Sequence, residues 1–299
     1  MRRPPARQDG VMIMHITPLI DPACGSPGQR LAWLAAGEDG RPLGTAFLWV
    51  PAAGGVADLQ LRVHPAERRA GVGTRLLDVA TDAAADRGMR GLLTEPVRQG
   101  EEGDRFCVAT GLRPVLALTY TRLRLEGDEP TGAPVPGYRL IHWEGTVPDE
   151  LANTFARSRR AMDDMPMGDT GYVAQPWDVE RLHAIADAVA RRDEILCTTA
   201  AVAADGEIVG FTEMVVPGDG RGHGQHYGTG VLPEHRGRGL ARWMKAEQIT
   251  WIRRRFPGLA GLLADTADSN TAMRQVNESL GYRATHRSLL YQRDLTAAN

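Results

Sequence analysis

Residues 231–241 read Val231-Leu-Pro-Glu-His-Arg-Gly-Arg-Gly-Leu-Ala241, and residues 63–73 read Val63-His-Pro-Ala-Glu-Arg-Arg-Ala-Gly-Val-Gly73. The two segments align without a gap at an offset of 168 residues. An apolar strand pattern precedes each segment, and a helical apolar pattern follows it, at 72–87 and 240–254. The sequence therefore predicts a duplicated unit of strand, glycine-rich turn and helix.

The surroundings of the two segments repeat as well. Each half continues with a short apolar strand, at 91–94 and 261–264, and then a helix that ends at a Gly-Leu or Gly-Tyr pair. Hairpin turns are expected upstream, at 38–40 and 205–206. Each half is predicted to be a mixed α/β layer structure.

A stretch rich in proline and glycine, residues 127–137, separates the two halves. The sequence predicts an N-terminal domain at 1–126, a linker at 127–137 and a C-terminal domain at 138–299. A chain of 299 residues is long enough for two domains that each bury a core.

Composition narrows the class of partner. The 35 basic and 37 acidic residues give a net charge of -2, which favours a small molecule or peptide over nucleic acid. No apolar run approaches the ~18 residues that span a bilayer, so no membrane association and a cytoplasmic location are expected. The three cysteines lack the paired spacing of a zinc site, and no metal site is predicted. The oligomeric state is left open.

The repeated turn carries the chemistry. Its small residues let backbone approach a ligand closely, and they begin a helix whose first N–H groups have no partner within the helix. Such a turn is suited to an anion, and a pyrophosphate placed there would contact roughly residues 69–74 or 237–242. Arginines around the two turns would add positive charge: Arg68, Arg69, Arg236, Arg238 and Arg242.

These segments resemble motif A of the GCN5-related N-acetyltransferases, a family that transfers acetyl groups from acetyl-CoA. The resemblance implies two tandem domains of that α/β fold. It also implies that acetyl-CoA contacts the second copy of the motif and, near the last helix, an asparagine of the stretch 266–270. The implied donor-binding residues are Val231, Arg236, Gly237, Arg238, Gly239, Leu240, Ala241 and Asn270.

Two departures from the family pattern concern catalysis. The family often has a tyrosine that protonates the leaving thiolate, four residues before the glycine of the Gly-aromatic pair. This sequence has Asn277 there in the second half and Cys107 in the first. Asn277 cannot donate a proton at neutral pH, but it can hydrogen-bond the thioester sulfur or orient a water; the alternative is a structural polar residue.

The first half lacks a counterpart of Asn270, and its stretch 94–105 is expected to form a loop. We predict that the first domain is degenerate or structural and that the second is catalytic. Main-chain N–H groups near 230–232 are expected to polarise the thioester carbonyl.

Glu213 and His226 are the candidates for the base. Glu213 interrupts an apolar strand, where an unpaired carboxylate is costly, and His226 lies in the strand that leads into the motif. The methionine- and aspartate-rich segment 161–169 is expected to shape the acceptor pocket, although its aspartates could merely cap a helix.

The resulting hypothesis is direct attack by an amine of a small molecule, such as an antibiotic or another secondary metabolite, on acetyl-CoA. Two alternatives stay open at this point. One is a non-catalytic module that binds acyl-CoA and has a regulatory role. The other is an acyltransferase that uses another acyl donor, or a peptide or protein amine as acceptor.

Overall fold

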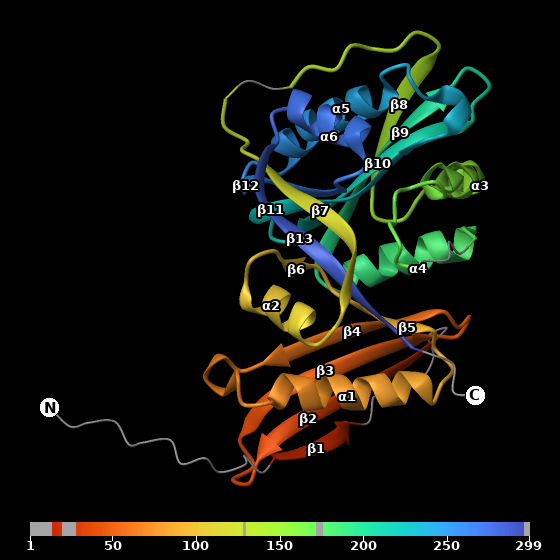
Figure 1. The fold of residues 1–299 in the computed structure, drawn as a ribbon. Coiled ribbons are helices and arrows are strands. Elements are labelled where there is room, and N and C mark those ends of the chain that lie inside the picture. Colours follow the sequence, from red (N-terminus) through yellow and green to blue (C-terminus); the bar gives the residue numbers. More distant parts are fainter. Residues whose placement is uncertain (1–13, 20–27, 128–129, 172–175, 296–299) are drawn as a thin grey trace, which may run out of the picture. The chain divides into compact units, whose positions relative to one another are not determined.

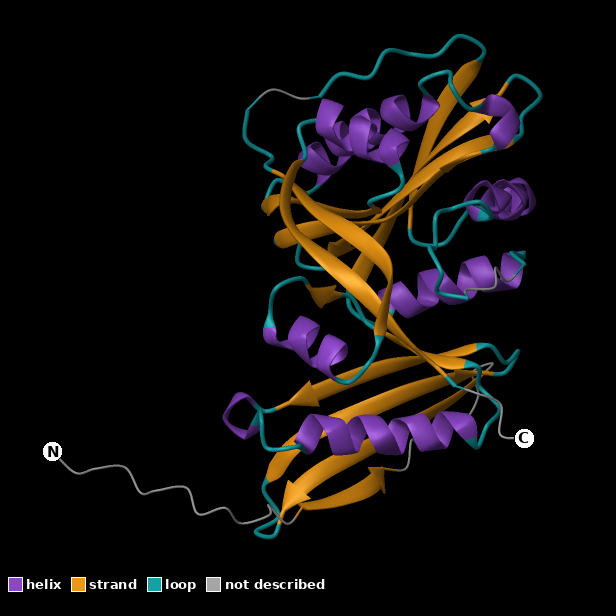
Figure 2. Ribbon diagram, viewed as in Figure 1, coloured by secondary structure: helices purple, strands orange, loops and turns teal. Residues whose placement is uncertain are grey.

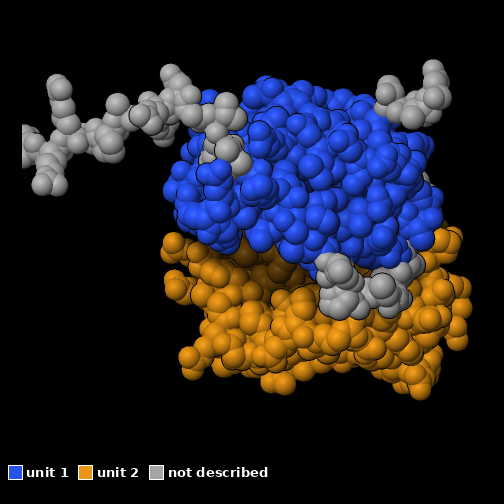
Figure 3. Space-filling model, turned by 90° about the horizontal axis from the view of Figure 1, so that it is seen from below, with its two compact units in different colours: residues 1–116, 168–172, 289–299 blue, residues 117–167, 173–288 orange. Residues whose placement is uncertain are grey.

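The computed structural model describes residues 14–19, 28–127, 130–171 and 176–295. The chain forms two compact units, shown in different colours in Figure 3. Unit 1 comprises residues 1–116, 168–172 and 289–299, and unit 2 comprises residues 117–167 and 173–288. Strands β7 (Arg113–Leu123) and β13 (Arg283–Asp294) each run from one unit into the other, so the division does not fall in the stretch 127–137. The domain boundaries drawn from the sequence stay a prediction.

Unit 1 is a twisted sheet with the helix α1 packed on β3 and β4 (Figure 1). The strands follow the order β1-β2-β3-β4-β5, antiparallel except for the parallel pair β4–β5, and the end of β13 pairs with β5. Its core joins Leu43 and Leu48 of the sheet to Leu76 and Leu77 of α1. The elements are β1 (Met14–Leu19), β2 (Gly28–Gly37), β3 (Pro42–Pro51), β4 (Val56–Val63), η1 (Pro65–Glu67), α1 (Val72–Ala85), β5 (Gly91–Thr94), β6 (Val97–Arg98), α2 (Glu102–Ala109) and the first part of β7 (Arg113–Leu123).

Unit 2 repeats this plan with more helices. Its strand order is β13-β7-β12-β11-β10-β9-β8, and β11–β12 is the parallel pair that corresponds to β4–β5. The elements are β8 (Tyr138–Glu144), α3 (Asp149–Ser158), η2 (Arg159–Met162), α4 (Val179–Ala190), β9 (Glu194–Ala203), β10 (Ile208–Pro217), β11 (Gly222–Val231), η3 (Pro233–His235), α5 (Leu240–Arg255), β12 (Leu259–Ala267), α6 (Thr271–Ser279) and β13 (Arg283–Asp294).

Helices cover both faces of the unit 2 sheet, with α3 and α4 on one side and α5 and α6 on the other (Figures 1 and 2). Phe211 of β10 packs with α3 residues, whereas Met214 packs with α5 residues. Every residue of β10 except Pro217 is buried, which explains why its sequence does not alternate between apolar and polar residues.

The repeat extends to the backbone conformation of the two glycine-rich turns. Gly71 and Gly239 precede the helices α1 and α5 with φ of 82° and 87°. Two residues earlier, Arg69 and Gly237 also have positive φ, 67° and 75°. A left-handed arginine is uncommon, so its presence at the aligned position indicates that the whole turn, and not only its glycines, has the same form in both units.

Candidate active site

The candidate donor site begins at the turn between β11 and α5. Gly237 and Gly239 adopt positive φ, and a Cβ added to either would meet nothing within 4 Å. Among the described residues, no side chain caps the first N–H groups of α5. The turn therefore offers open space and free backbone donors, and both suit the pyrophosphate of acetyl-CoA.

The side chains around this turn differ in burial, and this decides which of them can contact a donor. Those of Val231 and Leu240 are buried in the core, so these two residues can reach a donor only through their backbone. Ala241 is half-buried against the same core. Arg238 is exposed, and no described residue pairs with it, so it is free to reach a phosphate.

Arg236 ties the turn to the segment that follows α3. Its Nε donates to the carbonyl oxygen of Val231 (2.8 Å), and its Nη2 donates to that of Ala161 (3.2 Å). The same guanidinium forms a two-point ion pair with Asp164, with N–O distances of 2.5 and 2.8 Å. Arg236 lowers the pKa of this carboxyl group. Arg236 thus links the turn to the segment 161–169, which we call the acceptor-side segment after its predicted role. Because its guanidinium makes these contacts, few of its N–H groups remain to bind phosphate.

The parallel strands β11 and β12 separate before either one ends. They pair only through Gly222–Gln225 and Leu259–Leu263, whereas β11 continues to Val231 and β12 to Ala267. The edge of β11 beyond Gln225 therefore has backbone groups with no partner on β12, which can polarise a thioester carbonyl placed in the opening. We call this separation of the two strands, which is defined by where their backbone pairing ends, the cleft. Tyr227, an exposed residue, is bulged out of the pairing of β11 with β10.

The acceptor-side segment lies directly on β11. The short helix η2 packs on this strand, and a Cβ at Gly230 would lie 3.0 Å from Cβ of Ala161 and 3.1 Å from Sδ of Met162. Only glycine permits such a close approach here. Ala161 and Met162, the first residues of this segment, thus pack against β11 next to the cleft. Gly168 and Asp169, its last residues, belong to unit 1.

Glu213 is locked in a buried ion pair. Its carboxylate accepts from Nη2 of Arg159 at 2.5 Å, and the two side chains are 2% and 7% exposed. The guanidinium also lies 4.3–4.7 Å from the ring centroids of Phe155, Trp177 and Phe211. The role of Glu213 as the base stays a prediction, and this ion pair counts against it, because proton transfer would leave Arg159 without its counter-ion.

His226 belongs to a three-residue cluster on the α5 side of the sheet. Its Nε2 lies 2.6 Å from the hydroxyl of Tyr282 and 3.1 Å from Nζ of Lys245. Lys245 is the only lysine of the chain and is 2% exposed. Burial lowers the pKa of Lys245 to about 7 and raises that of Tyr282. Burial, and then the neighbouring Lys245, keep the pKa of His226 well below its usual value. Nε2 of His226 is thus engaged by two neighbours, whereas its buried Nδ1 has no hydrogen-bond partner among the described residues, and its role as the base stays a prediction.

The two asparagines of the α6 region make local hydrogen bonds. Asn270 caps the helix, since its Oδ1 accepts from the Met273 amide at 3.1 Å. Asn277 is buried, and its Nδ2 donates to Oγ1 of Thr266 on β12 at 3.1 Å. Its Oδ1 has no hydrogen-bond partner among the described residues. Both positions as donor-binding or catalytic residues stay predictions.

Asn277→Ala should lower kcat about fivefold if the side chain orients the leaving sulfur, because one such hydrogen bond contributes about 1 kcal/mol. The KM for acetyl-CoA should change less than kcat. Thr266→Val is the matched control, since it removes the partner of Asn277 but not the amide. Equal losses of kcat in the two variants would assign Asn277 a structural role only.

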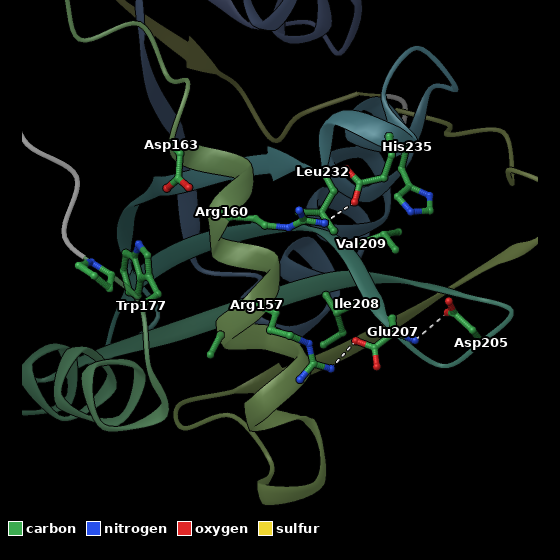
Figure 4. A pocket seen from close by; sticks show the side chains of 13 residues that line it. Arg157, Arg160, Asp163, Trp177, Asp205, Glu207, Ile208, Val209, Leu232 and His235 are labelled. Atoms are coloured by element: carbon green, nitrogen blue, oxygen red, sulfur yellow. Dashed lines mark hydrogen bonds and ion pairs between the residues drawn. The ribbon is translucent and has the colours of Figure 1, made fainter.

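A cavity of about 750 Å³ lies beside η3, on the α3 side of the sheet (Figure 4). Its charges are largely paired, Arg157 with Glu207 (2.5 Å) and Arg160 with Glu234. His235, which bonds to the Tyr138 hydroxyl at 2.9 Å, also lines it. The remaining lining residues are Ala156, Asp163, Pro176, Trp177, Asp205, Ile208, Val209 and Leu232. Because η3 leads directly into the donor turn, this cavity is adjacent to the candidate donor site.

Four residues of the site were not found from the sequence. Arg159 approaches its partner across a long stretch of chain and carries no local signal, and Tyr282 is recognisable from the sequence only as the aromatic residue of the Gly-aromatic pair. Lys245 could have been noticed, because a single lysine in a chain rich in arginine occupies a helix position that the apolar pattern assigns to the core. Asp265 interrupts the apolar strand β12 as Glu213 interrupts β10.

Comparison with known proteins places the chain in a family. The model of the Acetyltransferase (GNAT) family matches residues 14–101 and 159–282. A mycothiol acetyltransferase of Salinispora arenicola is 31% identical over 283 residues, which cover 90% of this chain and 82% of that protein. The mycothiol acetyltransferase of Thermomonospora curvata is 28% identical, with 96% and 89% covered.

Solved structures with a similar fold include a tandem GNAT protein from the clavulanic acid biosynthesis pathway. It has a TM-score of 0.75 at 22% identity, with 92% of this chain and 86% of that chain covered. A GCN5-related N-acetyltransferase from Sphaerobacter thermophilus has a TM-score of 0.67 at 21% identity, with 88% and 80% covered. Within the described residues, no helix is long and apolar enough to cross a membrane. The prediction of a tandem fold is confirmed, and the chain belongs to the GNAT family as an acetyl-CoA-dependent N-acetyltransferase with two tandem domains.

Proposed function

We propose that unit 2 binds acetyl-CoA at the turn 236–241 and transfers the acetyl group to an amine of a small molecule. The observation that carries this proposal is the open, left-handed turn at Gly237 and Gly239, which lies beside the cleft between β11 and β12. From Val231 back to His226, β11 spans about 16 Å, so a pantetheine arm that follows the strand brings the thioester into the cleft.

A small-molecule acceptor is supported by the relatives, which are named for the acetylation of mycothiol. The desacetyl form of mycothiol is therefore the first amine to test, together with polyamines, amino acids and amine-bearing antibiotics. The reaction is direct: the neutral amine attacks the thioester carbon, and backbone N–H groups of β11 stabilise the oxyanion.

We assign unit 1 a structural role. In its turn, Arg68 pairs with Glu102 of α2. A Cβ at Gly73 would lie 3.1 Å from the ring of Phe106, so this ring packs over the first turn of α1. In unit 1, α2 thus occupies the charge of Arg68 and the space beside Gly73, although the space at Gly71 itself is open.

Titration calorimetry of acetyl-CoA tests the assignment with a matched pair of variants. Gly239→Glu should abolish binding, because a carboxylate enters the space of the pyrophosphate. Gly71→Glu should leave binding within about twofold of wild type. Both residues have positive φ, so both variants carry a comparable backbone strain of about 1 kcal/mol. Loss of binding in Gly71→Glu alone would move the donor to unit 1, and no heat with the wild-type protein would overturn the proposal.

A further inference from the structure

A second group of polar side chains lies on the opposite face of the unit 2 sheet from His226. Gln225 of β11 donates from Nε2 to Oδ1 of Asp265 on β12 at 3.1 Å. Tyr120 of β7 is the register partner of Asp265, and the ring of His286 from β13 stacks on Tyr120 at 4.4 Å. Four neighbouring strands thus contribute one residue each, and we call this set the Asp265 cluster.

The cluster lies at the point where the cleft opens. Gln225 and Leu263 are the last register partners of β11 and β12, and Asp265 is two residues further along β12. Since side chains alternate along a strand, Asp265 is on the same face as Leu263. Gln225 pairs with Val215, which packs against α4, so this is the face that also carries α3 and η2. Asp265 therefore borders the cleft on the face of the sheet that carries the acceptor-side segment.

Of three candidate proton acceptors among the described residues, Glu213, His226 and Asp265, only Asp265 is open to an approaching amine. Glu213 is enclosed with Arg159, and Nε2 of His226 is engaged by Tyr282 and Lys245. Asp265 is exposed, although neighbouring atoms crowd its carboxyl group. The hydrogen bond from Gln225 to Oδ1 fixes the position of the carboxylate. Its second oxygen, Oδ2, can accept a hydrogen bond or a proton from another group.

We propose that Asp265 is the catalytic residue that accepts the proton of the attacking amine. This inference rests on the proposed function of unit 2. The acceptor arrives as an ammonium ion, and its first proton moves to Asp265 and then to solvent. The C–N bond forms, the C–S bond breaks, and the remaining proton lost by nitrogen ends on the sulfur of CoA. The products are the amide, the CoA thiol and one released proton.

The surroundings favour this role. Partial desolvation raises the pKa of Asp265 above its usual value, which makes the carboxylate a better proton acceptor than an ordinary aspartate. Tyr120 faces it with a pKa raised to about 12 and so stays neutral. The other titratable groups on this face are His286 beside Tyr120, and Arg122 and His223, each two residues from a cluster member along its strand.

The test uses the full chain and whichever amine of the panel above releases thiol fastest. Asp265→Asn keeps the shape and removes the charge, and it should lower kcat about 100- to 1,000-fold with a smaller change in the KM for the amine. In the wild-type protein, kcat should level off above the pKa of Asp265. In the variant, kcat should rise about tenfold per pH unit until the amine itself is neutral. Asp265→Glu should retain more activity than Asp265→Asn.

Asp219→Asn is the matched control, because Asp219 is an exposed aspartate in the β10–β11 turn whose carboxylate accepts, within the described part of the chain, from the Arg221 amide alone. Its kcat should equal that of wild type. Calorimetry with acetyl-CoA separates the two proposals. An Asp265→Asn protein that binds acetyl-CoA and turns over within twofold of wild type overturns the role of Asp265 alone. A wild-type protein that acetylates no amine overturns the proposed function, and this inference with it.

Discussion

Arg159→Met should lower the free energy of unfolding by about 3–5 kcal/mol, because it leaves the carboxylate of Glu213 buried without its counter-ion. Both side chains are almost fully enclosed, so water cannot replace the lost partner. The variant also removes the cation that lies against three aromatic rings. Since Arg159 begins η2, the segment next to the cleft should loosen with it.

Urea denaturation of three further variants makes this prediction specific. Arg159→Met combined with Glu213→Leu should regain most of the lost stability, because no charge is then left buried. Arg157→Met is the matched control two residues away, where the pair with Glu207 is exposed, and it should cost less than about 1 kcal/mol. If Arg159→Met and Arg157→Met cost the same, the ion pair with Glu213 is not an important source of stability.

The second large effect concerns Lys245 and pH. Its pKa is about 7 in the folded chain but ordinary in the unfolded one, so the unfolded state binds more protons between these two values. The free energy of unfolding should therefore rise with pH above 7, by up to about 1.4 kcal/mol per pH unit. His226 acts in the same direction at lower pH, because its pKa in the fold also lies below the usual value. The fold should thus be destabilised by acid.

Lys245→Met should lose this pH dependence between pH 7 and 9. Comparison with the wild-type protein cancels the buried thiols, whose raised pKa values, about 11 for Cys107 and about 12 for Cys197, act in the opposite direction. Because the chain has one lysine, a single Cε resonance reports its titration directly by NMR. A midpoint near 10, or parallel stability curves for the two proteins, would show that Lys245 is charged in the fold.

The helices and strands around the repeated turn could be predicted from the sequence. The strand at 91–94 was predicted at its observed bounds, and the helices predicted from 72 and 240 begin there. The hairpin at Asp205 also forms where expected, between β9 and β10. These features depend on local periodicity and on glycine, which the sequence displays directly. The stretch 94–105 differs, since it contains β6 and the start of α2 rather than a loop alone.

The polar contacts of the site could not be predicted in the same way. Arg159 meets Glu213 across 54 residues of chain, and Gln225 meets Asp265 across 40. Which residues face each other there depends on strand register and on the point where β11 leaves β12, and neither has a local pattern. Glu213 and His226 drew attention as polar residues in apolar strands, but the same reasoning could not tell an engaged group from an available one.

The enclosure of Lys245 has a consequence for how acceptors can be sought. Acetyl-CoA slowly modifies exposed lysines by direct chemical reaction, and a transferase that carries many of them accumulates label of its own. In this chain the sole lysine side chain is buried on α5, where its Nζ lies against His226 of β11 and the ring of Tyr282. Radiolabelled acetyl groups should therefore pass to added amines with little background on the lysine side chain of the enzyme, which makes complex metabolite extracts usable as a source of candidate acceptors.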